Sequence, residues 1–91
     1  MKNDIQVLKD FKKIKIPKIL YDEQQYDLID NHMILLSQID SVLSKNEINK
    51  KYVNIVSKED FNLLEKYAIG NDEIVQYLSK LNSVIDVLNR L

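Results

Sequence analysis

The residues that could carry acid–base or nucleophilic chemistry are few in this chain. His32 is the only histidine, and there is no cysteine. Cysteine nucleophiles, disulfides and thiolate metal sites are therefore excluded. A serine triad built on His32 would need an exposed nucleophile beside it, but Ser37, Ser41 and Ser44 lie on predicted helix surfaces or caps with no oxyanion-hole signature. The sequence predicts no catalytic residue, so we do not expect an enzyme.

An acidic cluster is the second candidate for chemistry. Glu23, Asp27 and Asp30 share one face of a predicted helix, and paired carboxylates can bind a divalent cation. Such sites in helical bundles draw further ligands from facing helices, and the sequence contains no second acidic or histidine motif that could supply them. A calcium loop with the Asp-x-Asp-x-Asp-Gly pattern is also missing from the sequence. We expect no metal and no cofactor, and interpret the cluster as a solvated face or a surface for a basic partner.

Three residues break the amphipathic pattern of the same predicted helix. His32 and Asp40 lie within its apolar arc, and Ile34 points into its acidic face. His32 and Asp40 lie about 12 Å apart along a helix axis, so each needs a partner from elsewhere. We expect an interface to supply it, because polar residues within an apolar face commonly set partner choice. The predicted partner-binding residues are Glu23, Asp27, Asp30, Ile34, His32 and Asp40.

Residues 1–20 are basic, with six lysines against two aspartates and a net charge of +4. A short helix is predicted from Asn3 or Asp4 through Phe11. The alternation of lysine and isoleucine over residues 13–16, before Pro17, predicts an extended connector. The segment is either a basic arm for phosphates or anionic surfaces, or it docks on the bundle through its isoleucines. The lysines of the possible arm are Lys12, Lys13, Lys15 and Lys18.

Residues 21–91 have the apolar periodicity and the caps of a helical bundle. The last predicted helix, 71–91, begins at the N-cap Asn71 after Gly70 and carries apolar residues at heptad spacing. Caps also predict helix starts at Asp22, Ser44 and Ser57. The apolar residues that form the main stripe of the helix from Asp22 are Tyr26, Ile29, Met33, Leu36, Ile39 and Leu43.

The predicted fold is therefore all-α: a small antiparallel bundle of about four helices, two long and two short, with a basic N-terminal arm. The domain organisation is an arm over residues 1–20 and a bundle over residues 21–91. Both long helices have apolar arcs of about half their circumference. Only two short helices are available to cover these arcs, so we expect a homodimer.

Charge and composition narrow the environment and the partner. The net charge is −1, but acidic and basic residues are unevenly distributed along the chain. Residues 21–44 carry five carboxylates and no lysine or arginine. Such blocks complement one another within a fold or across an interface. No apolar run approaches the length of about 20 residues that spans a bilayer, which predicts a cytoplasmic protein without a membrane contact. One arginine against abundant lysine is typical of an AT-rich bacterial or phage genome.

These features favour a non-enzymatic module that occupies the surface of a partner protein, as inhibitors, immunity proteins, antitoxins and chaperones do. The alternative is a structural homo-oligomer. A nucleic-acid accessory protein that uses the N-terminal lysines is a third hypothesis. Residues 46–69 have helix–turn–helix dimensions, but the second helix would begin with Glu59 and Asp60, which phosphates would repel.

Overall fold

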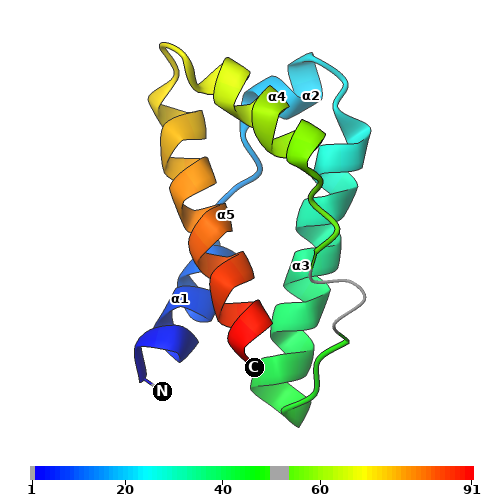
Figure 1. Ribbon diagram of the computed structural model, residues 1–91, viewed down its shortest axis with the longest axis vertical. Helices are drawn as coiled ribbons and strands as arrows, with labels where there is room; N and C mark the ends of the chain where they lie inside the picture. The colour runs from blue at the N-terminus through cyan, green and yellow to red at the C-terminus, as the bar shows by residue number, and fades with distance from the viewer. Residues whose placement is uncertain (1, 50–53) are drawn as a thin grey trace.

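A computed structural model describes residues 2–49 and 54–91 of the chain. Figure 1 shows the helices of these residues, and no strand occurs among them. The fold is all-α, as predicted, with five helices in the described ranges instead of about four. They are α1 (Lys2–Lys13), α2 (Lys18–Asp22), α3 (Tyr26–Lys45), α4 (Lys58–Ala68) and α5 (Asp72–Arg90).

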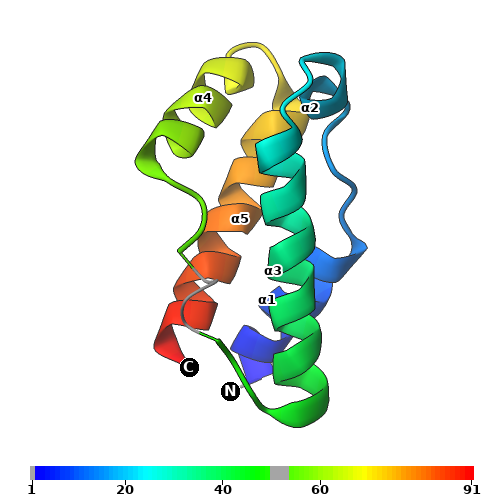
Figure 2. The ribbon, with the colours of Figure 1, turned by 90° about the vertical axis from the view of Figure 1, so that its right-hand side faces the viewer.

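The two long helices, α3 and α5, run in the same direction, which both views of the ribbon show (Figures 1 and 2). His32 meets Tyr77 in their first halves, and Val42 and Val87 line one cavity near their ends. The predicted antiparallel arrangement is therefore not confirmed for the long pair. Helix α4 begins beside the first half of α3, because the Asn31 side chain donates to Asp60 at 3.3 Å. Helix α4 lies obliquely across one end of the molecule, and α5 then starts from the same end as α3 (Figures 1 and 2).

Helix α1 is an integral part of the core and not a separate basic arm. The side chains of Leu8 and Phe11 are each 1% exposed, and α1 packs against both α3 and α5. Its start lies near the end of α5, where Arg90 forms an ion pair with Asp4 at 2.8 Å. The boundary expected between residues 20 and 21 falls inside α2. The docked alternative for residues 1–20 describes the structure, because the apolar side chains of α1 are buried while its lysines Lys9, Lys12 and Lys13 stay exposed to water.

The predicted caps of the last two helices are confirmed. Ser57 and Asp60 form a capping box at the start of α4, and the Asn71 side chain accepts from the Ile74 N–H at 3.3 Å at the start of α5. Gly70 separates the two helices with a φ of +71°, a conformation that glycine adopts without strain.

Two other predicted helix starts are wrong. Asp22 ends α2, and α3 begins after Gln25, because the positive φ of Gln24 turns the chain between them. Ser44 lies inside α3, and its hydroxyl donates to the backbone carbonyl of Asp40 at 2.6 Å. The described residues 46–49 and 54–57 form no helix. The short helix expected between them has its centre at residues 50–53, outside the described residues.

The buried face of α3 is rotated from the predicted stripe. Tyr26 and Met33 of the stripe are 61% and 54% exposed, whereas Leu28 and Leu35, which lie beside it, are buried; Ile39 of the stripe is also buried. The apolar arc of α3 is wider than the area its neighbours cover, so periodicity alone did not define the centre of contact. Because α1 and α2 both pack on α3, the cover that a second copy was expected to supply comes partly from the chain itself.

Candidate protein-binding surface

A cluster of three rings joins α1, α3 and α5 at the centre of the molecule. His32 is 2% exposed, and its Nδ1 lies 2.8 Å from the Tyr77 hydroxyl. The Phe11 ring lies 4.9 Å from the His32 ring and 6.3 Å from the Tyr77 ring, measured between centroids. Buried polar groups need such partners, and here His32 finds its partner inside the chain. This burial corrects the placement of His32 on a partner-binding surface.

Burial also changes the acid–base behaviour of this cluster. It lowers the pKa of His32 and raises the pKa of Tyr77, since the charged form of each group is poorly solvated. Both groups are therefore neutral in the folded protein at neutral pH. His32 is exposed in the unfolded chain, so its imidazole binds a proton there at a higher pH than it does in the folded protein.

We expect the free energy of unfolding to fall as the pH drops through the ordinary His pKa of 6.5. Above this pH the contribution of neutral His32 to the free energy of unfolding is fully present. Below it, while only the unfolded state binds the proton, the free energy of unfolding falls by at most about 1.4 kcal/mol per pH unit. Urea unfolding of the wild type and of His32→Gln from about pH 7.5 to about pH 5.5 measures it. An equal slope in the two proteins would contradict a buried neutral His32.

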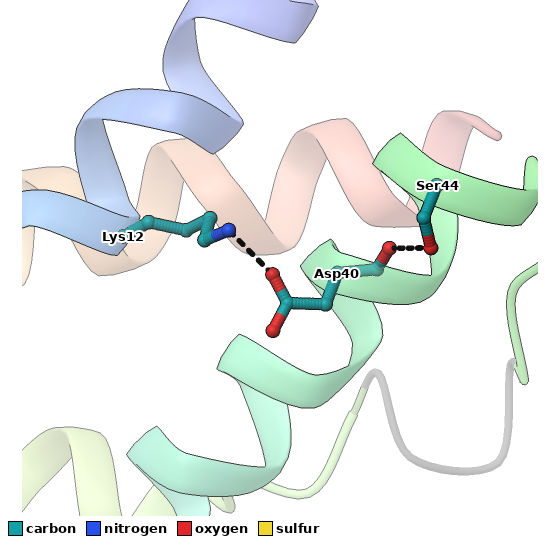
Figure 3. Close-up of polar contacts among 3 residues, drawn as sticks. All are labelled: Lys12, Asp40 and Ser44. Atoms are coloured by element: carbon teal, nitrogen blue, oxygen red, sulfur yellow. Dashed lines mark hydrogen bonds and ion pairs between the residues drawn. The ribbon is translucent and has the colours of Figure 1, made fainter.

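Asp40 has a partner in the same chain. Its Oδ1 forms an ion pair with the Lys12 ammonium of α1, as Figure 3 shows. The two side chains are 60% and 42% exposed, so water screens the pair. The pair joins the basic N-terminal block to the acidic block, which is the complementarity within the fold that the charge pattern allowed. An interface is not needed to satisfy Asp40.

Asp40→Asn should therefore change the free energy of unfolding by no more than about 1 kcal/mol, because exposed ion pairs contribute little. Asp40→Lys should also fold. Thermal unfolding of both variants beside the wild type tests this. An unfolded Asp40→Lys chain would mean that the carboxylate has a structural role that its exposure does not explain.

The acidic cluster lies on the surface near the start of α3. Glu23, Asp27 and Asp30 are exposed, but Glu23 is the C-cap of α2 and precedes α3, so the three carboxylates do not share one helix face as predicted. Ile34 is half-buried farther along α3. Among the described residues, no group of three or more histidine, cysteine or acidic side chains could hold a metal ion. These carboxylates thus belong to a surface that presents negative charge to solvent.

Four exposed apolar residues belong to segments that lie at the same end of the molecule, and we call these four residues the apolar end. Tyr21, Tyr26, Ile69 and Val75 are 53%, 61%, 84% and 50% exposed. They come from α2, the first residue of α3, the α4–α5 turn and the first turn of α5. Figures 1 and 2 both show these segments together at one end.

Two hydrogen bonds fix the segments of the apolar end to one another. The Lys18 N–H donates to the Glu73 carboxylate at 3.0 Å, which joins α2 to α5. The Gln25 side-chain amide donates to the Tyr67 hydroxyl at 3.0 Å, which joins the start of α3 to the end of α4. The apolar end is therefore presented by packed helix ends.

Sequence reasoning missed Ile69 and Val75 as surface residues. A signal for each is present, because Ile69 lies beyond the last turn of α4 and Val75 lies outside the heptad seam of α5. Other exposed apolar residues, Ile5, Met33 and Leu91, lie outside the apolar end. Exposed apolar groups are common one at a time, so the four residues at this end are a candidate binding surface and not by themselves evidence of one.

The helices of the described residues include none that is long and apolar enough to cross a membrane. Comparison with known protein families, with curated proteins and with solved structures finds no match to this chain.

Proposed function

We propose that this protein is a non-enzymatic binding module that occupies the surface of a partner protein through its apolar end. The observation that carries the proposal is the joint exposure of Tyr21, Tyr26, Ile69 and Val75. Interfaces are enriched in tyrosine, which offers a large rigid face and one polar handle, and their centres are apolar with a polar rim. An inhibitor, an immunity protein or antitoxin, or a chaperone would act in this way.

The charges around the apolar end favour a basic partner. Asp22, Glu23, Asp27 and Asp72 are exposed on the same segments. Complementary charge at a rim speeds association and rejects wrong partners. The same charges disfavour the alternative in which two copies pair through this end, because a two-fold axis would bring the carboxylates of both copies together. They also disfavour nucleic acid at this end, because phosphates carry the same sign of charge.

The double variant Tyr26→Ser/Ile69→Ser is expected to reduce partner binding at least tenfold while stability changes by no more than about 0.5 kcal/mol per site. Both side chains are mostly exposed, so their loss leaves the core intact. The tagged protein is used to capture partners from the cells that express it, and the affinity of each variant for the captured protein is then measured.

Met33→Ser is the matched control, because Met33 is an exposed apolar residue outside the apolar end. It should bind like the wild type. Equal binding by all three proteins would contradict the proposal. Light scattering of the wild type and of Tyr26→Ser/Ile69→Ser tests the alternative, a homo-oligomer. If the wild type is a dimer and the double variant is a monomer, the partner at the apolar end is a second copy of the chain.

A further inference from the structure

Helix α1 covers the buried imidazole of His32. The Phe11 ring packs on the His32 ring with 4.9 Å between the centroids, and the two side chains are 1% and 2% exposed. The Nδ1 atom of His32 lies 2.8 Å from the Tyr77 hydroxyl of α5, and this is the one hydrogen bond that joins the ring to a described residue. A neutral imidazole fits this site, because its Nδ1 can either donate to a hydroxyl or accept from it.

The surroundings of His32 do not suit a protonated ring. A cavity of about 10 Å³ beside it is lined mainly by leucine and valine side chains, with Asn31 and Tyr77 as its other polar residues. No carboxylate in the described ranges bonds to the ring. A protonated His32 would therefore have a buried charge and a second N–H without an acceptor, which is costly. The Phe11 ring attracts a cation, but more weakly than water does.

The charged side chains that flank the ring cluster on the four packed helices are exposed or already bonded. They are Asp10 and Lys12 on α1, Asp30 on α3, Asp60 on α4, and Glu73 and Lys80 on α5. A protonated His32 gains no partner from them while the helices stay closed. Its charge is stabilised only if water reaches the ring.

Helix α1 buries less than the other helices of the ring cluster. Among its described side chains, Leu8 and Phe11 are buried, whereas α5 buries six. Ion pairs to Arg90 and to Asp40 add to this attachment, and Figure 3 shows the second of them. Exposed pairs of this kind contribute little to stability. Release of α1 is therefore the local opening that exposes His32 at the least cost.

The contacts that remain after such a release hold the rest of the fold together. Helices α3, α4 and α5 share an apolar centre without α1, formed by Leu28, Leu35, Leu64 and Leu81. The Tyr77 hydroxyl can accept from a protonated ring as well as from a neutral one, so α5 keeps its bond to His32. The connector after α1, residues 14–17, ends at a fixed point, because the Lys18 N–H donates to Glu73 at 3.0 Å.

We propose that α1 is an acid-sensitive lid, which protonation of His32 releases while α3, α4 and α5 stay packed. In the open state water reaches the ring, and the apolar side chains beside Leu8, among them Val42 and Val87, become accessible. Histidine suits this role, because its ordinary pKa of 6.5 lies close to neutral pH. The lid includes no residue of the apolar end, so its test is independent of the proposed function.

Fluorine NMR can follow the lid, because the chain contains two phenylalanines, Phe11 and Phe61. Both are replaced with 4-fluorophenylalanine, and the two signals are followed from about pH 7.5 to about pH 5. The Phe11 signal should move toward its position in the urea-unfolded protein as the pH falls. Phe61 belongs to α4, so its signal should keep the folded position. The ratio of open to closed protein should rise by at most about tenfold per pH unit, the limit for one proton.

His32→Gln is the control, because glutamine does not titrate in this range. Its Phe11 signal should not move between the two pH values. If His32→Gln does not fold, His32→Leu replaces it. Three results would overturn the proposal: Phe11 and Phe61 signals that change together, a wild-type Phe11 signal that does not move, or the same movement in the His32 variant.

Leu8→Ala weakens the closed state without changing an ionisable group, since Leu8 is 1% exposed on α1. Opening should therefore begin at a higher pH than in the wild type. Ile5→Ala on the same helix is the matched control, because Ile5 is 44% exposed and its loss should shift the onset less. If Leu8→Ala does not fold, Leu8→Val replaces it. An unchanged onset in the Leu8 variant, or an equal shift in Ile5→Ala, would contradict the lid.

Discussion

Replacing Phe11 with alanine is expected to lower the free energy of unfolding by about 3 to 5 kcal/mol. Phe11 is 1% exposed, and its ring contacts both His32 of α3 and Tyr77 of α5. Its removal leaves a cavity where α1, α3 and α5 meet. Small domains have a total stability of about 5 to 15 kcal/mol, so this single change consumes a large part of it.

Lys9→Ala on the same helix is the control, because Lys9 is exposed and should change stability by no more than about 0.5 kcal/mol. Urea unfolding monitored by circular dichroism measures both variants. If Phe11→Ala and Lys9→Ala cost the same, residues 1–20 would be a loosely attached arm, and the account of the core would be wrong.

Leu81→Ala is expected to cost about 2 to 5 kcal/mol, because Leu81 is 2% exposed in the middle of α5. Ile85 belongs to the same heptad seam but is only half-buried, so Ile85→Ala should cost less than Leu81→Ala. Heptad spacing alone predicts equal losses at the two positions, whereas their burial in the structure predicts a larger loss at Leu81.

Ser83→Ala should have an effect of no more than about 0.5 kcal/mol. Ser83 is exposed, and its hydroxyl donates to the Ser79 carbonyl at 3.0 Å on the outer face of α5. Chemical unfolding of the three variants in one series tests the ordering. Equal losses at Leu81, Ile85 and Ser83 would mean that the buried face of α5 is assigned incorrectly.

Local chemistry allowed the last two helices to be predicted well. The capping box at Ser57 and the N-cap at Asn71 act within a single turn, so their signals do not depend on distant contacts. The all-α class followed from the apolar periodicity of residues 21–91 and from these caps. Helix α2 was missed because Pro17 and an alternating segment precede it, and five residues are too few to show a period.

Features that depend on distant contacts were harder to predict. The cap spacing at Asp22 and Gln25 resembled a helix start, but Gln25 bonds instead to Tyr67 across the molecule. The direction of α5 relative to α3 depends on the path of the chain between these two helices, which no local signal in the sequence determines. The apolar arc of α3 is broad enough to allow more than one buried face. Packing of α1 and α2 on α3 determines which face is buried.

The sequence did not predict the four residues of the apolar end as a binding surface. The acidic cluster of Glu23, Asp27 and Asp30 is exposed, but its partner-binding role stays a prediction. His32 was chosen because a lone polar residue on an apolar arc needs a partner, and Tyr77 supplies that partner within the core. Ile69 was overlooked because analysis by periodicity considers helices, whereas Ile69 lies in the turn that follows one.

Site-directed photo-crosslinking at Ile69 tests the central claim most directly. A photoreactive phenylalanine analogue is placed at Ile69 in one preparation and at Asn82, an exposed residue of α5 outside the apolar end, in another. Irradiation in the cells that express the protein should give one discrete adduct with a different protein from position 69 and none from position 82. Adducts of equal yield at both positions, adducts between two copies of the chain, or no adduct at position 69 would contradict binding of a partner protein through the apolar end.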